Sequence, residues 1–156
     1  MGSYSDGKSN RLVGRPMEVL LVEDSLVDAR LTMGALQKSD IPHRLTLMRD
    51  GLEATDFLLQ RGIFARAPRP DLVLLDLHLP FRNGLEVLWE IRNHDELRPL
   101  PVVVLTSSDD PESKAQCEQH EVDGFLQKPV HIAEFLVLVR QLRRHWKQDV
   151  LLPGIE

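Results

Sequence analysis

The chain of 156 residues has the length of a single domain, and its 42% hydrophobic and 28% charged residues are ordinary for a globular protein. The formal net charge of −5 argues against a nucleic-acid-binding surface, which needs clustered basic residues. The single cysteine, Cys117, excludes an internal disulfide and fits a reducing compartment. The sequence has no apolar run of the roughly 18 residues that span a membrane, and its N-terminus lacks the apolar stretch of a signal peptide. We therefore expect a cytoplasmic protein with neither a nucleic acid nor a membrane as partner.

The first half of the sequence predicts two strands and two helices behind a polar leader. Residues 1–15 are rich in Gly, Ser, Asn, Lys and Arg, so we expect them to be disordered. Ser25 is a good N-cap residue, and Val27, Leu31 and Ala35 repeat at the i, i+4 spacing of a helix. The expected elements are a buried strand at about 17–22, a helix from Ser25 to about Lys38, an alternating strand at 44–48, and a helix from Gly51 to about Arg61 followed by a loop over 62–70.

The second half continues the alternation of strand and helix. Asn83-Gly84 marks a turn into a helix, and the acids and proline at 109–112 are typical of the first turn of another. The expected elements are strands at 72–75, 102–105 and 123–126, and helices at about 85–93, from 109–112 onward, and from about His131 to Lys147.

Strands that alternate with helices predict a parallel sheet covered by helices on both faces, so the expected fold class is α/β. Five strand–helix units in this length fit a doubly wound, flavodoxin-like sheet with strand order 2-1-3-4-5. We expect this domain to cover residues 16–147, followed by a C-terminal tail at 148–156.

Four of the predicted strands end in polar side chains. Glu23 and Asp24 follow the first strand, Asp76 closes the third, and Thr106 and Lys128 follow the last two. Because ligand and catalytic groups gather outside the carboxyl ends of parallel strands, we expect all five at one edge of the sheet. Taken singly, each is explained as well by a helix cap or a turn. For all five at the same edge, that explanation is much weaker.

The three carboxylates of Glu23, Asp24 and Asp76 would repel each other unless protons or a cation relieve them. Oxygen-only ligands at a solvent-accessible strand edge suit Mg²⁺, so these residues are the predicted metal ligands. A carboxylate beside a cation can attack a phosphoryl group, and the Lys128 ammonium and Thr106 hydroxyl can contact the transferred oxygens. The residues therefore predict Asp76 as a nucleophile in phosphoryl transfer.

Over residues 17–147 the chain resembles the receiver domain of two-component response regulators. This resemblance implies that Asp76 accepts a phosphoryl group from a histidine kinase. The motifs that carry it are Glu23-Asp24-Ser25, Leu72 to Pro80, Asn83-Gly84, Thr106 and Lys128-Pro129.

The resemblance also implies roles for individual residues. Thr106 would follow the phosphoryl group, and Phe125 would be the switch aromatic that rotates with it, at a position where family members often have tyrosine. Lys128-Pro129 would be a cis peptide bond that turns the lysine toward Asp76. The implied Mg²⁺ ligands are the side chains of Glu23, Asp24 and Asp76 and the backbone carbonyl of His78.

Further short motifs are similar to those of the single-domain response regulators paired with bacterial phytochromes, which are light-sensing histidine kinases. This narrower resemblance implies that the phosphodonor is a bacteriophytochrome. The motifs are Arg49-Asp50-Gly51, Arg69 to Leu72, Leu77 to Pro80, Leu100 to Thr106, and Trp146 with Leu152-Pro153.

Two other functions stay open at this point. A phosphatase with an aspartate nucleophile on a similar sheet would show Asp-x-Asp, whereas Asp76 is followed by Leu77-His78. A receiver-like module that binds without being phosphorylated would not need Thr106 and Lys128 beside the acidic pair. We therefore expect a signalling protein rather than an enzyme.

The end of the chain is unusually apolar. Residues 135–139 form a run wider than one buried helix stripe, and more apolar residues follow at 146–152. Burial within the domain and contact with a second subunit or the kinase explain this surplus about equally well. We expect a homodimer joined through the last helix and the C-terminal tail.

Overall fold

The structure is a computed structural model, and it describes residues 14–107 and 111–153. Within these ranges a single parallel sheet has the strand order β2-β1-β3-β4-β5. The predicted fold class and strand order are confirmed. The strands are β1 (Met17–Val22), β2 (His43–Met48), β3 (Leu72–Asp76), β4 (Val102–Thr106) and β5 (Gly124–Gln127).

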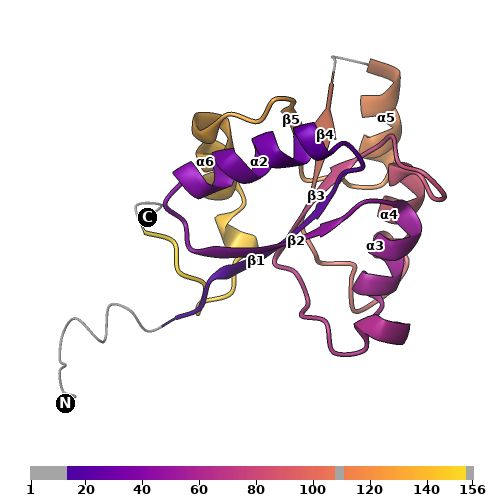
Figure 1. The fold of residues 1–156 in the computed structure, drawn as a ribbon, viewed down its shortest axis with the longest axis horizontal. Coiled ribbons are helices and arrows are strands. Elements are labelled where there is room, and N and C mark those ends of the chain that lie inside the picture. Colours follow the sequence, from indigo (N-terminus) through magenta and orange to yellow (C-terminus); the bar gives the residue numbers. More distant parts are fainter. Residues whose placement is uncertain (1–13, 108–110, 154–156) are drawn as a thin grey trace.

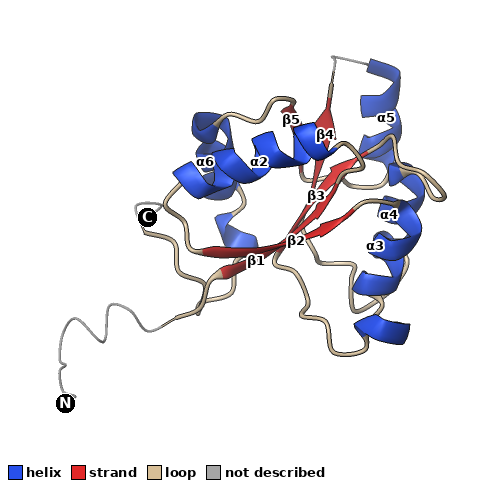
Figure 2. Cartoon of the chain, viewed as in Figure 1, coloured by secondary structure: helices blue, strands red, loops and turns tan. Residues whose placement is uncertain are grey.

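Helices cover both faces of the sheet (Figures 1 and 2). Helices α2 and α6 lie on one face, and α3, α4 and α5 lie on the other. No helix of the described ranges is long and apolar enough to cross a membrane. The helices are α2 (Leu26–Lys38), α3 (Gly51–Leu58), α4 (Gly84–Arg92), α5 (Pro111–Gln119) and α6 (Ile132–Gln141), with short 3₁₀ helices η1 (Gly62–Phe64) and η2 (Arg143–His145).

Strand β3 shows why the sequences of the central strands are continuous apolar runs. Its side chains alternate between the two faces, and each face is covered by helices. Leu72 and Leu74 join the core under α2 and α6, while Val73 and Leu75 join the core under α3 and α4. All four are fully buried. Asp76 continues this strand, so the buried scaffold fixes its position.

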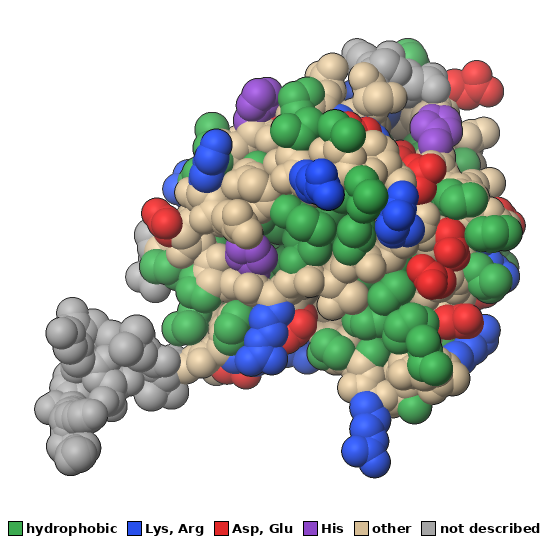
Figure 3. Space-filling model, viewed as in Figure 1, with side chains coloured by type: hydrophobic (Ala, Val, Ile, Leu, Met, Phe, Trp, Pro, Cys, Tyr) green, Lys and Arg blue, Asp and Glu red, His purple; other side chains and the backbone are tan. Residues whose placement is uncertain are grey.

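Helix α2 forms where it is predicted, but it turns a different side to the sheet. Ser25 caps it by accepting a hydrogen bond from the Asp28 amide (3.2 Å). Val27 and Leu31, two members of the predicted apolar stripe, are 67% and 50% exposed. Figure 3 shows hydrophobic side chains at the surface around this helix. The sheet is instead contacted by small side chains and one leucine: Ala29, Thr32, Ala35 and Leu36.

The last helix is shorter than predicted. Helix α6 ends at Gln141 rather than near Lys147, and the chain continues into η2. The reason is a tertiary contact, because Trp146 folds back and its indole N–H donates to the Val139 carbonyl (2.9 Å). Trp146 and Val150 are both buried in the core under α2 and α6. Much of the apolar surplus at the end of the chain is thus covered within the domain.

The two ends of the described chain are tied together at Arg15. It forms an isolated parallel bridge with Val150. Its guanidinium donates to both oxygens of Asp71 (2.7 and 2.9 Å) and to Asp149 (3.0 Å). Residues 1–13 of the predicted leader lie outside the described residues. Arg15, the last residue of the predicted leader, lies against the domain through these ion pairs and the bridge.

Gly84 lets helix α4 approach the end of β3 closely. A Cβ at this position would lie 2.4 Å from the Asp76 carbonyl oxygen and 2.6 Å from the Leu77 Cα. We expect Gly84→Ala to lower the free energy of unfolding by about 1–3 kcal/mol, because the backbone around Asp76 must shift. Gly34→Ala is the control, since nothing lies within 4 Å of a Cβ there. It should raise stability by about 0.5–1 kcal/mol, as alanine favours a helix interior. Urea unfolding of both variants measures this, and equal effects would contradict it.

Candidate functional site

The predicted site residues meet at the carboxyl ends of β1, β3, β4 and β5. Glu23 directly follows β1, and Asp76 and Thr106 are the last residues of β3 and β4. Lys128 directly follows β5, and its backbone N–H donates to the Thr106 carbonyl (2.7 Å). The parallel register pairs Asp76 with Leu105, so the ends of the central strands lie level. One edge of the sheet therefore carries all of these groups.

Lys128 stands at the centre of the carboxylates. Its ammonium donates to Glu23 Oε1 (3.0 Å), Asp28 Oδ2 (3.2 Å) and Asp76 Oδ2 (3.4 Å). The Lys128 side chain is 11% exposed. The predicted cis geometry of the Lys128-Pro129 peptide bond is confirmed. An ammonium has three N–H donors, and each here has a carboxylate acceptor.

Glu23, Asp24 and Asp76 form a cluster that could hold a metal ion. Each offers a carboxylate oxygen, and these oxygens lie within 4.8 Å of one another. Glu23 is fully buried and Asp76 nearly so, while Asp24 is exposed to solvent. An all-oxygen set with one open side fits a hard divalent cation that keeps some of its water. The backbone N–H of His78 donates to the other oxygen of Asp76 (3.2 Å), which fixes that carboxylate.

The proximity of the acids changes their protonation. Burial, together with the hydrogen bond and charge of the neighbouring Asp76, raises the pKa of Glu23 to about 7, although Lys128 and the Ser25 amide lower it. Burial lowers the pKa of Lys128, but hydrogen bonds and charge from Glu23, Asp76 and Asp28 outweigh it, so this pKa lies above its usual range. The ammonium is thus charged at every physiological pH, whereas Glu23 can gain or lose a proton near neutrality.

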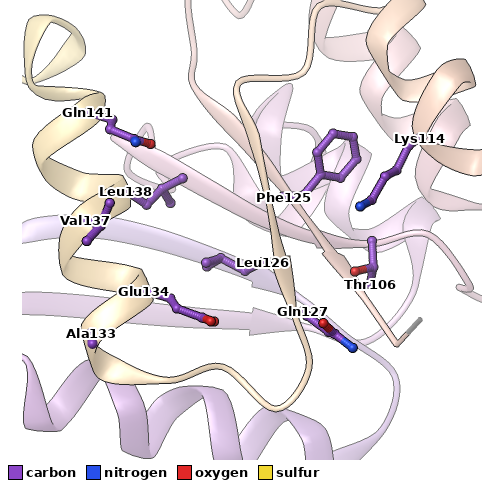
Figure 4. A pocket seen from close by; sticks show the side chains of 10 residues that line it. All are labelled: Thr106, Lys114, Phe125, Leu126, Gln127, Ala133, Glu134, Val137, Leu138 and Gln141. Atoms are coloured by element: carbon purple, nitrogen blue, oxygen red, sulfur yellow. The ribbon is translucent and has the colours of Figure 1, made fainter. Parts of the chain in front are cut away.

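Thr106 and Phe125 lie on the side of the site that faces α5 and α6. Both line a groove of about 560 Å³ between these two helices. Figure 4 shows Phe125 and Lys114 on one side of the groove and Ala133 and Val137 of α6 on the other. The Lys114 ammonium lies 5.5 Å from the centre of the Phe125 ring. Thr106 therefore shares a surface groove with Phe125, so a movement of the Thr106 side chain would alter the surroundings of the ring.

Asp28 belongs to the site although its sequence position did not single it out. It lies in the first turn of α2, and its side chain is 35% exposed. The sequence does hold one signal, because Asp28 follows Asp24 by four residues at the start of a predicted helix. This position falls in the first turn of the helix, next to the strand end that carries Glu23 and Asp24.

The comparisons with known proteins agree on one family. The model of the response regulator receiver domain matches residues 19–140. The chain is 41% identical over 139 residues to the response regulator Rcp1 of Synechocystis sp., and the match covers 89% of this chain and 95% of Rcp1. The solved Mn²⁺-bound form of Rcp1 is similar with a TM-score of 0.71 at 40% identity, covering 89% of this chain and 100% of the other.

Two further solved structures are similar over nearly the same length. The phosphorylated cyanobacterial phytochrome response regulator RcpA gives a TM-score of 0.72 at 37% identity, covering 89% of this chain and 99% of that one. The bacteriophytochrome response regulator AtBRR gives 0.77 at 37% identity, covering 90% and 99%. Together with the sheet order and the family match, these show that the chain belongs to the receiver domain family of two-component response regulators.

Proposed function

We propose that Asp76 is the residue of this response regulator that accepts a phosphoryl group from a histidine kinase. The observation that carries the proposal is the contact of the Asp76 carboxylate with the Lys128 ammonium, within the cluster that Asp76 forms with Glu23 and Asp24. Membership of the receiver family and the phosphorylated state of RcpA support it.

In the proposed step, a carboxylate oxygen of Asp76 forms a bond to phosphorus while the bond from phosphorus to the donor histidine breaks, and the imidazole, whose other ring nitrogen already carries a proton, leaves as the neutral base. Lys128 would contact the transferred oxygens, and the Thr106 hydroxyl would donate to them once its side chain moves. A bound Mg²⁺ would neutralise charge on the phosphoryl group. The groups that would hold it are the carboxylates of Glu23, Asp24 and Asp76 and the backbone carbonyl of His78.

The kinase is proposed to be a bacterial phytochrome. The support is similarity, since RcpA and AtBRR are phytochrome response regulators at 37% identity. Transfer of labelled phosphate from a panel of autophosphorylated histidine kinases, with phytochromes among them, tests the proposal in the presence of Mg²⁺. Fast transfer from a phytochrome with slow transfer from the others supports it. Equal or absent transfer from the phytochromes would contradict the choice of partner.

The chain is proposed to act in the cytoplasm as a switch rather than as an enzyme that turns over small substrates. Stoichiometric labelling by acetyl phosphate, without turnover of small phosphate esters, is the expected result. Continuous hydrolysis of such esters, lost on changing Asp76, would favour the aspartate phosphatase instead. Absence of labelling with every donor would favour a module that binds without phosphorylation.

The signal is proposed to leave the domain through the groove between α5 and α6. Phosphorylation adds about −1.5 to −2 charges beside Thr106, and a signal at a distance needs an element with two arrangements. Phe125 lies in the same groove as Thr106, so space vacated by the threonine is available to the ring. The surface that this would change is formed by α5 and α6.

A homodimer through α6 is part of this proposal. The tail is a weaker candidate than the sequence indicates, because Trp146 and Val150 are buried within the domain. Val137 on α6 is 48% exposed and lines the groove beside Ala133. Light scattering should give twice the mass of the chain, and Val137→Lys should lower it to the monomer mass. A monomer at every accessible concentration of the unmodified chain would contradict the dimer.

Phe125→Ala should separate phosphorylation from output. We expect labelling of Asp76 within about 2-fold of the unmodified protein, because the ring lines the groove, whose lining includes none of the clustered carboxylates. The change in dimer or kinase affinity on phosphorylation should be lost. Phe64→Ala is the matched control, since Phe64 is also partly buried but packs against Phe57 far from the groove. A full affinity change in the Phe125 variant would show that another residue is the relay.

A further inference from the structure

We propose that Asp28 is a positioning residue, which holds the Lys128 ammonium at the site while Glu23 and Asp76 are engaged by other partners. This inference rests on the proposed function, because it assigns Asp28 a part in phosphoryl transfer to Asp76. Asp28 would not touch the phosphoryl group. It would act through Lys128.

The geometry places three carboxylates around one ammonium. Glu23, Asp28 and Asp76 accept from Lys128 at 3.0, 3.2 and 3.4 Å. Two of these three, Glu23 and Asp76, also belong to the cluster that could hold a metal ion, whereas Asp28 does not. The acceptors of Lys128 are therefore of two kinds: two shared with the metal cluster, and one outside it.

This difference matters during the reaction. Glu23 and Asp76 are the two acceptors that would also coordinate a bound cation. Asp76 also loses its negative charge when its oxygen bonds to phosphorus, because the product is an acyl phosphate. Lys128 then keeps one full carboxylate partner, Asp28. A lysine side chain is long and flexible, so an anchor of this kind limits where its ammonium can go.

Asp28 is itself held in place. Its backbone N–H donates to the Ser25 hydroxyl (3.2 Å) at the cap of α2, which fixes the first turn of the helix. A carboxylate in that turn is favoured by the partial positive charge of the helix N-terminus. Its side chain is 35% exposed, so replacing it leaves the apolar core intact. The contact with Lys128 thus joins α2 to the loop after β5 at the rim of the site.

The test compares Asp28→Asn and Asp28→Glu with Glu53→Gln. Glu53 is the matched control because it holds the same third position in α3, with Asp50 as the N-cap, and its change also removes one carboxylate from a helix N-terminus. The first measurement is the rate at which acetyl phosphate and Mg²⁺ label Asp76. The second is the ¹H–¹⁵N signal of the Lys128 ammonium in the metal-free protein, which is visible only when the ammonium exchanges slowly with water.

We expect Asp28→Asn to slow labelling by about 3- to 10-fold, the range of one charge-assisted hydrogen bond at a partly exposed position. The Lys128 ammonium signal should be lost in this variant. Asp28→Glu should restore both readouts in part. Glu53→Gln should leave the signal in place and the rate within about 2-fold, since salt screens an exposed charge that makes no contact with Lys128.

Two results would overturn the proposal. One is an unchanged ammonium signal together with a labelling rate equal to that of Glu53→Gln, which would show that Asp28 anchors nothing. The other is a loss of Mg²⁺ affinity as large as that caused by Asp24→Asn, which would make Asp28 a metal ligand instead. If the unmodified protein takes no label while the signal still depends on Asp28, the anchor stands and the assignment of Asp76 fails. The two proposals are therefore separable.

Discussion

Asp76→Asn is expected to abolish stable labelling of the protein by acetyl phosphate and Mg²⁺. The amide keeps the shape of the carboxylate and its place beside Lys128, but it is not a nucleophile toward phosphorus. Mass spectrometry of the intact protein should show one added phosphoryl group on the unmodified chain and none on the variant. The expected loss is complete, because the described part of the site holds its other acids as partners of Lys128 or of the metal cluster.

Asp24→Asn is the control for this experiment. It removes one acid of the same cluster but leaves Asp76 in place. Labelling should slow at low Mg²⁺ and recover as the Mg²⁺ concentration rises, whereas the Asp76 variant should not recover at any concentration. Labelling of Asp76→Asn to the extent of the unmodified protein would show that a different residue is the acceptor.

The second large effect expected is a pH-dependent affinity for Mg²⁺ near neutrality. Because burial and Asp76 raise the pKa of Glu23 to about 7, the metal-free site carries a proton on this carboxyl below that pH. Mg²⁺ must displace the proton in order to bind. For a single group with this pKa, the dissociation constant should rise about 10-fold between pH 8 and pH 6. Isothermal titration calorimetry in buffers of different ionisation enthalpy measures both the affinity and the proton released.

The same pKa predicts how the stability of the metal-free protein changes with pH. Between the ordinary value of 4.5 and about 7, the folded protein holds a proton on Glu23 that the unfolded chain has lost. Stability from this group is therefore fully present below about 4.5 and is lost as the pH rises through about 7. The loss should be on the order of 3 kcal/mol, and added Mg²⁺ at pH 8 should offset it.

Glu23→Gln is the control for both measurements, because the amide does not titrate. Its Mg²⁺ affinity should be weaker at pH 8 and should change little between pH 6 and pH 8. The metal-free variant should also lack the fall in stability between pH 4.5 and 7. Identical pH profiles for the variant and the unmodified protein would show that Glu23 is not the titrating group.

Local sequence patterns determined much of this protein. Apolar runs predicted the buried strands, the cap residue Ser25 predicted where α2 begins, and the turn at Asn83-Gly84 predicted where α4 begins. The order of the strands followed from the alternation of strand and helix, since only a few topologies bury such units. The same alternation predicted that Asp76 and Lys128 would meet, because the carboxyl ends of parallel strands share one edge.

Other features were decided only by contacts between distant parts of the chain. Arg15 lies against the domain because Asp71 and Asp149 bind it, 56 and 134 residues away in sequence. Helix α6 ends early because Trp146 finds a place in the core, which competes with continuing the helix. Helix propensity and capping depend on a few neighbouring residues, so they do not predict stabilisation by contacts with distant parts of the chain.

The site itself shows the same division. That acids and a lysine gather at one edge follows from the positions of the strands in the sequence. How they share charge does not, because the raised pKa of Glu23 depends on its burial and on its distance from Asp76. The third acceptor of Lys128 is likewise set by how α2 is rotated on the sheet, which exposes Val27 and turns Asp28 toward the loop after β5. Spacing along the chain fixes which residues reach the edge, and packing decides which atoms touch there.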